Sequence, residues 1–212
     1  MGPPLDRRRF LHSASTLAFA GLVSSMLGCS TTTRLNNKVS GYGPLLPDAN
    51  QLLDLPEGFS YEIISAFGQE MSDGFHVPDR ADGMGCIPLN DKEVVLIRNH
   101  ELSLTSIEAQ PDSIQTLKSA SSYDTFPNGV ALPGGTSNIV FNLETGRVEK
   151  EFLSLVGTIR NCSGGVTPWG SWLTCEESVS MPDDTIKQEH GYIFEVPAAA
   201  NGLTEAKPLK EM

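Results

Sequence analysis

The sequence predicts an all-β protein that forms part of a β-propeller, and three observations lead to this expectation. Short alternating or β-branched runs follow one another from about residue 57 to the end, each bounded by turn residues. They come as hairpin after hairpin, and the same order then repeats. We therefore expect a β-propeller fragment of about two four-stranded blades plus one leading strand. A β-sandwich is the alternative for the same strands.

The leading strand and the first blade precede residue 156. The run Val94-Val95-Leu96-Ile97 is β-branched and almost entirely apolar, as in a strand buried on both faces. Leu143-Glu144-Thr145-Gly146 is a strong hairpin signal. Residues 102–134 show no clear periodicity and are expected to form a long insertion with a short helix near 113–119. The expected strands cover residues 59–67, 82–89, 92–98, 136–142 and 147–155.

The second blade follows the same order, with strands expected over residues 157–167, 171–177, 191–196 and 203–209. The distance from Gly85 to Gly164, the corresponding glycines of the two inner hairpins, exceeds the roughly 40–50 residues of an ordinary blade. The insertion accounts for the excess. Because a propeller needs at least about four blades to close, we expect a piece of a longer protein. Its open sheet edges predict that this piece alone aggregates or stays partly unfolded.

Residues 1–28 are predicted to be an export signal, followed by a linker over 29–56 and the propeller part over 57–212. Asp6-Arg7-Arg8-Arg9-Phe10-Leu11-His12 resembles the twin-arginine signal, whose translocation machinery carries folded cargo. The weakly apolar stretch 13–27 is shorter than the roughly 18–20 residues of a bilayer span. A disordered basic tail is the alternative. The signal predicts a periplasmic or extracellular protein.

Cys29 ends a short run, Met26-Leu27-Gly28-Cys29, that is similar to a lipoprotein cleavage box. Lipidation of Cys29 and soluble release after ordinary cleavage both remain open. In the first case the protein meets the membrane through a lipid anchor only.

The chain is acidic, with a net charge of −11 that becomes −13 without the signal, which carries three arginines and one aspartate. This acidity argues against a surface that grips nucleic acid. It would also repel a phosphate substrate unless bound cations reversed the local field.

A tight hairpin in the second blade carries the strongest chemical signal. Its turn lies at Pro168 to Gly170, because proline presets φ and glycine tolerates the strained position. A three-residue turn puts Cys162 opposite Glu176, and a two-residue turn puts it opposite Glu177, with roughly 5 Å between Cβ atoms. The pair Gly164-Gly165 leaves room for a ligand or another backbone. A soft thiolate beside a hard carboxylate suggests a metal site, and a buried cysteine beside a solvated acidic turn is the alternative.

The first blade is expected to bring further donors to the same rim. A turn at Asn90-Asp91 puts Asp82 opposite Asn99, and a turn one residue longer puts it opposite His100. Glu101 follows directly. Each of these residues also has a structural interpretation, as part of a turn, a satisfied histidine or a solvated side chain.

Two cysteines and several loop aspartates are left over. An exported protein permits a disulfide between Cys86 and Cys175, but two buried free thiols are the favoured interpretation. The loop aspartates are expected to face solvent: Asp112, Asp124, Asp183 and Asp184.

Several motifs together resemble the PhoX family of bacterial alkaline phosphatases over residues 56–212. They are Asp82-Gly83-Met84-Gly85, Arg98-Asn99-His100-Glu101, Gly134-Gly135-Thr136, Arg160-Asn161-Cys162-Ser163-Gly164-Gly165, the run from Thr167 to Glu177, and the run from His190 to Val196. The run around Cys162 is the most specific of these.

The resemblance implies a propeller phosphatase that hydrolyses phosphomonoesters outside the cytoplasm, with ferric iron (Fe³⁺) and calcium at the channel mouth. It also implies that Cys162 ligates iron. From the strand geometry, carboxylate and amide ligands are assigned to Glu176, Glu177, Glu101 and Asn99, with Asp82 and His100 on the same rim. Candidates for binding phosphate are Arg98, Arg160 and Asn161, the arginines through their forked donors.

Two functions therefore remain open for the chain. The first is an exported metal-dependent phosphatase, with the part present here inactive by itself. The second is an envelope-anchored propeller protein that binds calcium or a partner and has no catalysis.

Overall fold

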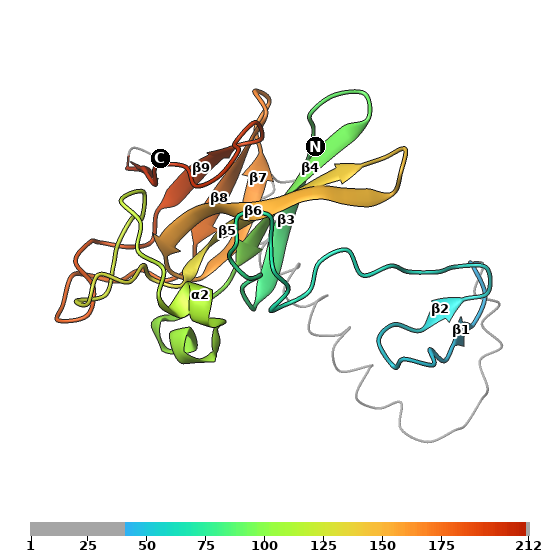
Figure 1. Ribbon diagram of the computed structural model, residues 1–212, viewed down its shortest axis with the longest axis horizontal. Helices are drawn as coiled ribbons and strands as arrows, with labels where there is room; N and C mark the ends of the chain where they lie inside the picture. The colour runs from blue at the N-terminus through green and yellow to red at the C-terminus, as the bar shows by residue number, and fades with distance from the viewer. Residues whose placement is uncertain (1–40, 211–212) are drawn as a thin grey trace, which may run out of the picture. The chain divides into compact units, whose positions relative to one another are not determined.

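The computed structural model describes residues 41–210, and within them the chain is all-β, with three antiparallel sheets (Figure 1). Contacts divide the chain after Tyr61, so residues 41–61 and 62–210 are described separately. The expected signal segment and Cys29 lie outside the described residues. No helix among residues 41–210 combines the length and apolar character needed to cross a membrane.

The first unit is a small hairpin. Its strands β1 (Leu45–Leu46) and β2 (Leu55–Pro56) pair antiparallel. The Asp48 carboxylate closes the loop between them by accepting the Leu52 N–H at 3.0 Å and the Tyr61 hydroxyl at 2.6 Å. The hydrogen bond from Tyr61, with those from the loop N–H groups, lowers the pKa of Asp48 to about 2.

The prediction of a leading strand at residues 59–67 is wrong, because these residues form no strand. Near the end of this segment, backbone and side-chain donors form hydrogen bonds with side chains rather than with the backbone of a neighbouring strand. The Ala66 N–H donates to Gln69 at 2.7 Å, and the Ser65 hydroxyl donates to Glu151 at 2.7 Å. Alternating apolar residues therefore do not make a strand where no partner ladder is present.

The first four-stranded sheet has the order β3-β4-β5-β6. The four strands occupy the stretches expected for the first blade and are joined by short turns, apart from the insertion between β4 and β5. The Asn90 side chain caps the first turn by accepting the Lys92 N–H at 2.9 Å. Gly146 takes a left-handed φ of 67° in the turn between the last two strands. The strands are β3 (Ala81–Pro88), β4 (Glu93–His100), β5 (Gly134–Asn142) and β6 (Arg147–Thr158).

The second sheet has the order β10-β9-β8-β7 and occupies the stretch expected for the second blade. Of the two turns considered for this hairpin, the three-residue turn is the one present, since the Thr167 N–H donates to the Ser171 carbonyl at 2.9 Å. Gly170 supplies the left-handed φ of 85° in that turn. The strands are β7 (Asn161–Val166), β8 (Ser171–Glu176), β9 (Ile193–Pro197) and β10 (Pro208–Leu209).

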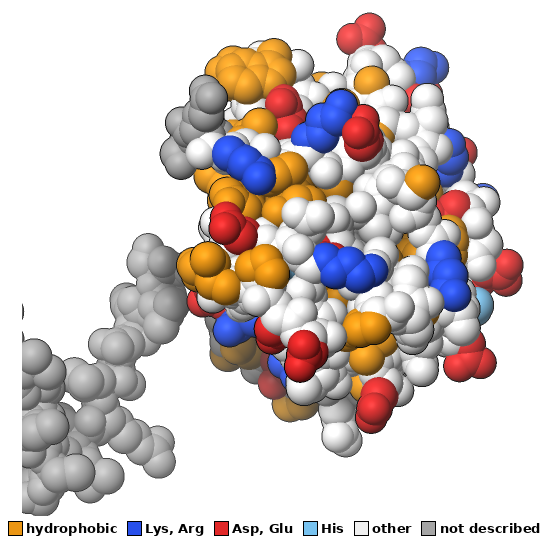
Figure 2. Space-filling view, turned by 90° about the vertical axis from the view of Figure 1, so that its left-hand side faces the viewer, with side chains coloured by type: hydrophobic (Ala, Val, Ile, Leu, Met, Phe, Trp, Pro, Cys, Tyr) orange, Lys and Arg blue, Asp and Glu red, His pale blue; other side chains and the backbone are white. Residues whose placement is uncertain are grey.

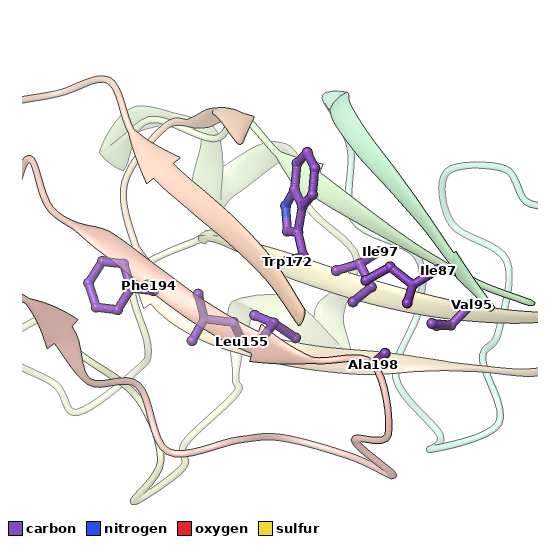
Figure 3. Close-up of a cluster of buried hydrophobic side chains, with 8 residues drawn as sticks. Ile87, Val95, Ile97, Leu155, Trp172, Phe194 and Ala198 are labelled. Atoms are coloured by element: carbon purple, nitrogen blue, oxygen red, sulfur yellow. The ribbon is translucent and has the colours of Figure 1, made fainter. Parts of the chain in front are cut away.

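The main hydrophobic core contains side chains from both of these sheets (Figure 3). The Trp172 ring of β8 lies against β3 at Gly85, where an added Cβ would be 2.5 Å from the ring. Burying each large apolar side chain here contributes about 1.5–3 kcal/mol to stability. The core residues are Ile87, Val95, Ile97, Leu155, Trp172, Phe194, Val196 and Ala198.

The insertion between β4 and β5 begins with the 3₁₀ helix η1 (Leu104–Ala109) and the helix α2 (Asp112–Gln115). This helix starts one residue earlier and ends sooner than the sequence predicts. The insertion packs on β6 through a second apolar cluster that includes Ile114, Leu117 and Leu153. At Gly157, with φ of 88°, an added Cβ would be 2.7 Å from the backbone nitrogen of Tyr123, so the two segments touch directly.

Candidate functional site

Cys162 occupies a bulge rather than a register position. Ser163 pairs with Cys175, as the three-residue turn requires, but the next pair joins Asn161 to Glu176. Cys162 is therefore the extra residue of the bulge, and the expected pairing of Cys162 with Glu176 is wrong. A bulge bends the strand and changes the direction of the side chains at its position.

A second bulge lies at the corresponding place in the first sheet. Met84 pairs with Arg98 and Ala81 pairs with His100, which leaves Asp82 and Gly83 together opposite Asn99. Asp82 therefore lies opposite Asn99, as one of the two expected turns requires, but it shares this position with Gly83. Gly83 allows close contact between the sheets, because an added Cβ there would be 2.6 Å from the Cys162 carbonyl oxygen.

Arg160 joins the segments around these bulges. It has a left-handed φ of 52°, which is uncommon outside glycine and marks a constrained position. Its N–H donates to the Leu102 carbonyl at 3.0 Å, and its carbonyl accepts the Glu177 N–H at 2.9 Å. Its guanidinium binds Glu101, at 2.7 Å, and also Glu177. We call Asp82, Glu101, Arg160, Cys162 and Glu177 the rim.

The electrostatics of the rim are those of an acidic cluster with one cation. Hydrogen bonds from Arg160 lower the pKa of Glu101, with smaller contributions from Asp82 and Glu177. The bond to Glu101 and the charge of Glu177 raise the pKa of Arg160. Burial raises the pKa of the Cys162 thiol, and the nearby carboxylates Glu177, Asp82 and Glu101 raise it further. The thiol therefore lies in a field that would favour an added cation.

The donor types on the rim suit the metals that the resemblance implies. Three carboxylates against one guanidinium leave two negative charges uncompensated while the thiol is protonated. Carboxylates are ligands for hard cations such as Ca²⁺, and a thiolate suits a softer metal ion. Within residues 41–210, no group of three or more His, Cys, Asp and Glu side chains is already arranged to hold a metal ion. In the structure Arg160 lies where it bridges two of the carboxylates.

Asn99 and His100, expected on the same rim, are buried in structural roles. The Asn99 amide donates to the Ser163 carbonyl and accepts from Trp172 and Thr174, so it links the two sheets. Both ring nitrogens of His100 are engaged, one by Asp79 and one by Ser137. Burial, together with the charge of Arg98, lowers the pKa of His100 to about 3, so the ring is neutral at physiological pH.

Arg98 and Asn161 are also buried in the structure. The Arg98 guanidinium pairs with Glu151 at 2.9 Å, and burial lowers its pKa. The Asn161 amide accepts the Thr158 hydroxyl at 2.5 Å and donates to Thr174 at 2.9 Å. Of the three residues expected to bind phosphate, Arg160 is the one that the structure places on the rim.

Glu176 belongs to a different group of residues, which the sequence did not reveal. Its carboxylate accepts the His190 Nδ1 at 2.6 Å, and the His190 Nε2 lies 3.3 Å from Asp124. All three side chains are almost completely buried. The expectation that Asp124 faces solvent is therefore wrong, because the insertion folds back against the second sheet. We call Asp124, Glu176 and His190 the His190 cluster.

The charge of His190 follows from its two carboxylate partners. Burial opposes the charged imidazolium, but the hydrogen bonds and charges of Glu176 and Asp124 outweigh it and raise the pKa of His190. The Tyr123 ring lies edge-on to the imidazole at 5.1 Å. Burial, with the charge of Glu176, raises the pKa of Tyr123 to about 12. The run from His190 to Val196 is distinctive in the sequence, but nothing in its spacing indicates a partner for the histidine.

The cysteines of the described part are free thiols. Cys175 is half-buried on β8, whereas Cys86 of β3 is exposed, contrary to the expectation that both are buried. On the face drawn in Figure 2, acidic and basic side chains are interspersed with hydrophobic ones. On that face the acidic side chains are therefore scattered and form no continuous patch.

Comparison with known proteins gives one family. The model of the family described as alkaline phosphatase PhoX matches residues 40–132 and residues 132–212. The search of curated proteins and the search of solved structures each gave no match. The family match includes every residue of the rim and of the His190 cluster.

Proposed function

The chain belongs to the PhoX family of alkaline phosphatases, and from this premise we propose that the rim is the phosphate-ester site of a metal-dependent phosphomonoesterase. The observation that supports this most directly is the convergence of one thiol, three carboxylates and one arginine from two different sheets. Such a set combines metal donors with a phosphate-binding group at one place.

Each rim residue has a role in this proposal. Cys162 would hold iron through its thiolate, and Glu101, Glu177 and Asp82 would supply oxygen ligands to iron or calcium. The bound metals would neutralise the ester oxygens and stabilise the charge that develops on the leaving oxygen. Arg160 exchanges its carboxylate partners for the phosphate, which it orients through two parallel N–H donors. Its side chain is 43% exposed, so this exchange requires no unfolding.

Glu176 has no free oxygen for such a role. One oxygen accepts from Ile159 and His190, and the other accepts from Gly191 and Tyr192. We therefore narrow the set of carboxylate ligands from the expected pair of adjacent glutamates to Glu177, and we assign Glu176 to the support of the site.

We also propose that the two four-stranded sheets are neighbouring blades of a propeller. Each sheet is a meander in which consecutive strands are neighbours, and the main core lies between the two sheets. Strands β3 and β7 then lie nearest the channel, and the rim lies at their shared end. A propeller places metal donors from different blades around one channel mouth in this way.

Export by the twin-arginine pathway to the periplasm or beyond, with or without a lipid on Cys29, remains part of the proposal. It is supported by the sequence of residues 1–29 alone. Mass spectrometry of the mature N-terminus tests it, because a lipidated Cys29 and an unmodified terminus have different masses. A mature protein that keeps residues 1–28 would contradict the export signal.

The test of the metal assignment is Cys162→Ser, with Cys86→Ser as its control. Cys86 is a free, exposed thiol on β3 that lies outside the rim. In a protein that carries the remaining propeller blades, we expect Cys162→Ser to lose iron, measured by elemental analysis, and to lose turnover of p-nitrophenyl phosphate, whereas Cys86→Ser keeps both. Unchanged iron content in Cys162→Ser would refute the assignment. Bound calcium without iron or turnover in the wild type would favour the non-catalytic binding protein instead.

A further inference from the structure

We propose that His190 is a positioning residue for the rim and that it acts through Glu176. This inference rests on the proposed function, because it concerns how the same site is held in shape. His190 lies outside the rim and, in the described structure, makes no hydrogen bond to a rim side chain.

The Glu176 carboxylate is the connection between His190 and the rim. One oxygen accepts the Ile159 N–H at 2.8 Å, and the residue after Ile159 is Arg160. Glu176 is itself followed by Glu177. A single buried carboxylate therefore fixes the chain directly before both partners of the Arg160–Glu177 ion pair.

Arg160 needs such support because of its backbone. A left-handed conformation costs a non-glycine residue about 1–2 kcal/mol, so the surrounding structure has to maintain it. The Glu176 bond to Ile159 holds the preceding residue, and the Leu102 and Glu177 bonds hold Arg160 on either side. If Glu176 turned away, the segment would be free to relax and the guanidinium would leave its place between the two rim carboxylates.

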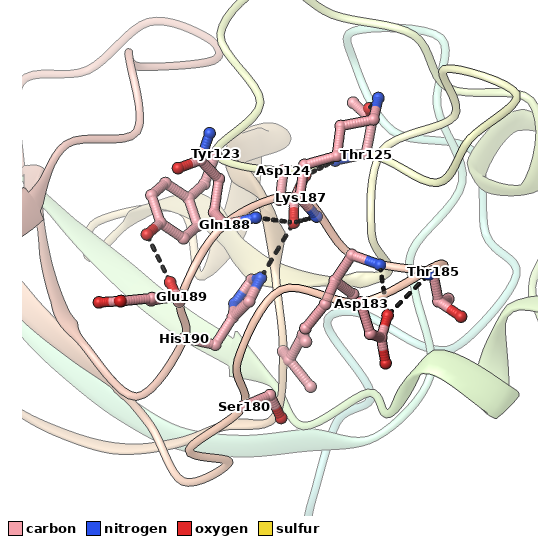
Figure 4. A network of polar contacts seen from close by, with 12 residues as sticks. Tyr123, Asp124, Thr125, Ser180, Asp183, Thr185, Lys187, Gln188, Glu189 and His190 are labelled. Atoms are coloured by element: carbon pink, nitrogen blue, oxygen red, sulfur yellow. Dashed lines mark hydrogen bonds and ion pairs between the residues drawn. The ribbon is translucent and has the colours of Figure 1, made fainter.

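His190 keeps Glu176 in place through the contact at 2.6 Å. Asp124 in turn orients His190 (Figure 4). The same Asp124 oxygen accepts the N–H groups of Lys187 and Gln188, at 2.8 and 2.9 Å. Asp124 also donates its own N–H to the Gly157 carbonyl at 3.0 Å, which anchors it on β6. The arrangement is that of a buried imidazole whose direction is set by a carboxylate on its far side, as around metal-ligating and catalytic groups.

A second buried ion pair provides the comparison that separates positioning from stability. Arg98 and Glu151 are as well buried as many core side chains, with side chains 6% and 9% exposed. Glu151 bonds to Ser65, Arg98 and Ser72, none of which belongs to the rim. Neutralising Glu151 therefore weakens the fold without disturbing Arg160 or Glu177.

The experiment compares His190→Leu, His190→Asn and Asp124→Asn with Glu151→Gln, all in the full chain. We measure bound iron by elemental analysis, Ca²⁺ affinity by calorimetry and the thermal unfolding midpoint.

Changes in residues that orient metal ligands typically weaken metal binding roughly 10- to 100-fold, and we expect this loss in His190→Leu. His190→Asn, whose amide nitrogen lies near the position of Nδ1, keeps the donor to Glu176 and should restore most of the affinity. Asp124→Asn should give an intermediate loss, and Glu151→Gln should lower the unfolding midpoint with no loss of affinity.

Each outcome decides between positioning and a purely structural role. A loss of metal affinity in His190→Leu that His190→Asn recovers, while Glu151→Gln loses stability but keeps its affinity, supports the positioning role. Equal metal affinity in wild type, His190→Leu and Glu151→Gln shows that His190 is structural only. If His190→Leu does not fold, His190→Asn and His190→Gln still decide, because only the first keeps the donor to Glu176, and equal metal affinity in the two overturns the inference. A wild type that takes up no metal overturns the proposed function and this inference together.

Discussion

The rim and the His190 cluster have the same charge pattern in opposite surroundings. In the rim, Arg160 lies between Glu101 and Glu177, with side chains 43%, 27% and 51% exposed. In the cluster, His190 lies between Asp124 and Glu176, and these side chains are at most 2% exposed. The two groups meet at adjacent glutamates. Burial, rather than the order of charges along the chain, therefore decides which carboxylate is available to a ligand.

The ion pairs of the rim and of the His190 cluster are expected to contribute differently to the stability of the fold. An exposed ion pair contributes about 0–1 kcal/mol to stability, because water and salt screen it. Breaking a buried pair by removing one partner costs about 3–5 kcal/mol, because the other charge stays buried without compensation. The rim can therefore exchange its partners at little cost, whereas the His190 cluster cannot.

The largest effect is expected for Glu176→Gln. Each oxygen of the Glu176 carboxylate accepts two hydrogen bonds. In the glutamine variant an NH₂ group replaces one of these oxygens, so a donor would face donors whichever way the amide is turned. We expect the free energy of unfolding to fall by about 3–5 kcal/mol, measured by urea denaturation. A variant as stable as wild type would show that the carboxylate charge is not needed in the cluster and would remove the contrast with the rim.

A change of pH is expected to have an intermediate effect on the free energy of unfolding. Because the pKa of His190 is raised above its ordinary value of 6.5, its contribution to stability is complete below pH 6.5 and is lost as pH rises through the folded-state pKa. Glu101 has the opposite sign, since its pKa is lowered from 4.5 and its contribution is lost as pH falls through the folded-state value. One proton corresponds to a slope of at most about 1.4 kcal/mol per pH unit.

The measurement is the free energy of unfolding as a function of pH for wild type and His190→Asn. We expect the wild type to lose stability on the alkaline side more steeply than the variant, which lacks the titrating ring. Parallel curves for the two proteins above pH 6.5 would mean that His190 is not charged in the folded state.

The smallest effect is expected for Glu177→Gln. Glu177 is exposed and bound by one arginine that keeps a second carboxylate, so unfolding should become easier by less than about 1 kcal/mol. The difference from wild type should shrink further as salt is added, because screening weakens exposed pairs. If Glu177→Gln lowered the free energy of unfolding as much as Glu176→Gln, the two adjacent glutamates would contribute equally to stability. Their difference in burial would then not explain their roles.

The strands of the two four-stranded sheets could be located from the sequence because most of them are short alternating or β-branched runs between turn residues. The turn at Pro168 to Gly170 also set the register of β7 and β8 as far as Ser163. The pairing beyond Ser163 was not predictable, since a bulge adds one residue to the strand and the local sequence pattern does not show where it lies. The predicted pairing of Cys162 with Glu176 failed for this reason, although Cys162 and the adjacent Glu177 both lie on the rim.

The His190 cluster was not predictable from sequence spacing. Loop aspartates usually face solvent, so Asp124 was assigned to the surface. Its burial depends on the insertion folding against Gly157 and on a histidine that is distant in the sequence. The proposed metal donors on the rim could be named as residue types, but which of two adjacent glutamates belongs to the rim depends on tertiary contacts.

Asn99 has a consequence for the order in which the protein folds. Its bonds to Trp172 and Thr174 join residues 73 and 75 positions apart, and it also bonds the Ser163 backbone. Hairpins form in about 1–10 µs, whereas contacts between distant segments wait for the loop between them to close. The thiol and the carboxylates of the first sheet therefore come together late, after both hairpins have formed. Under the proposed metal assignment, an iron ion that arrived before this contact formed would meet single donors rather than the complete set.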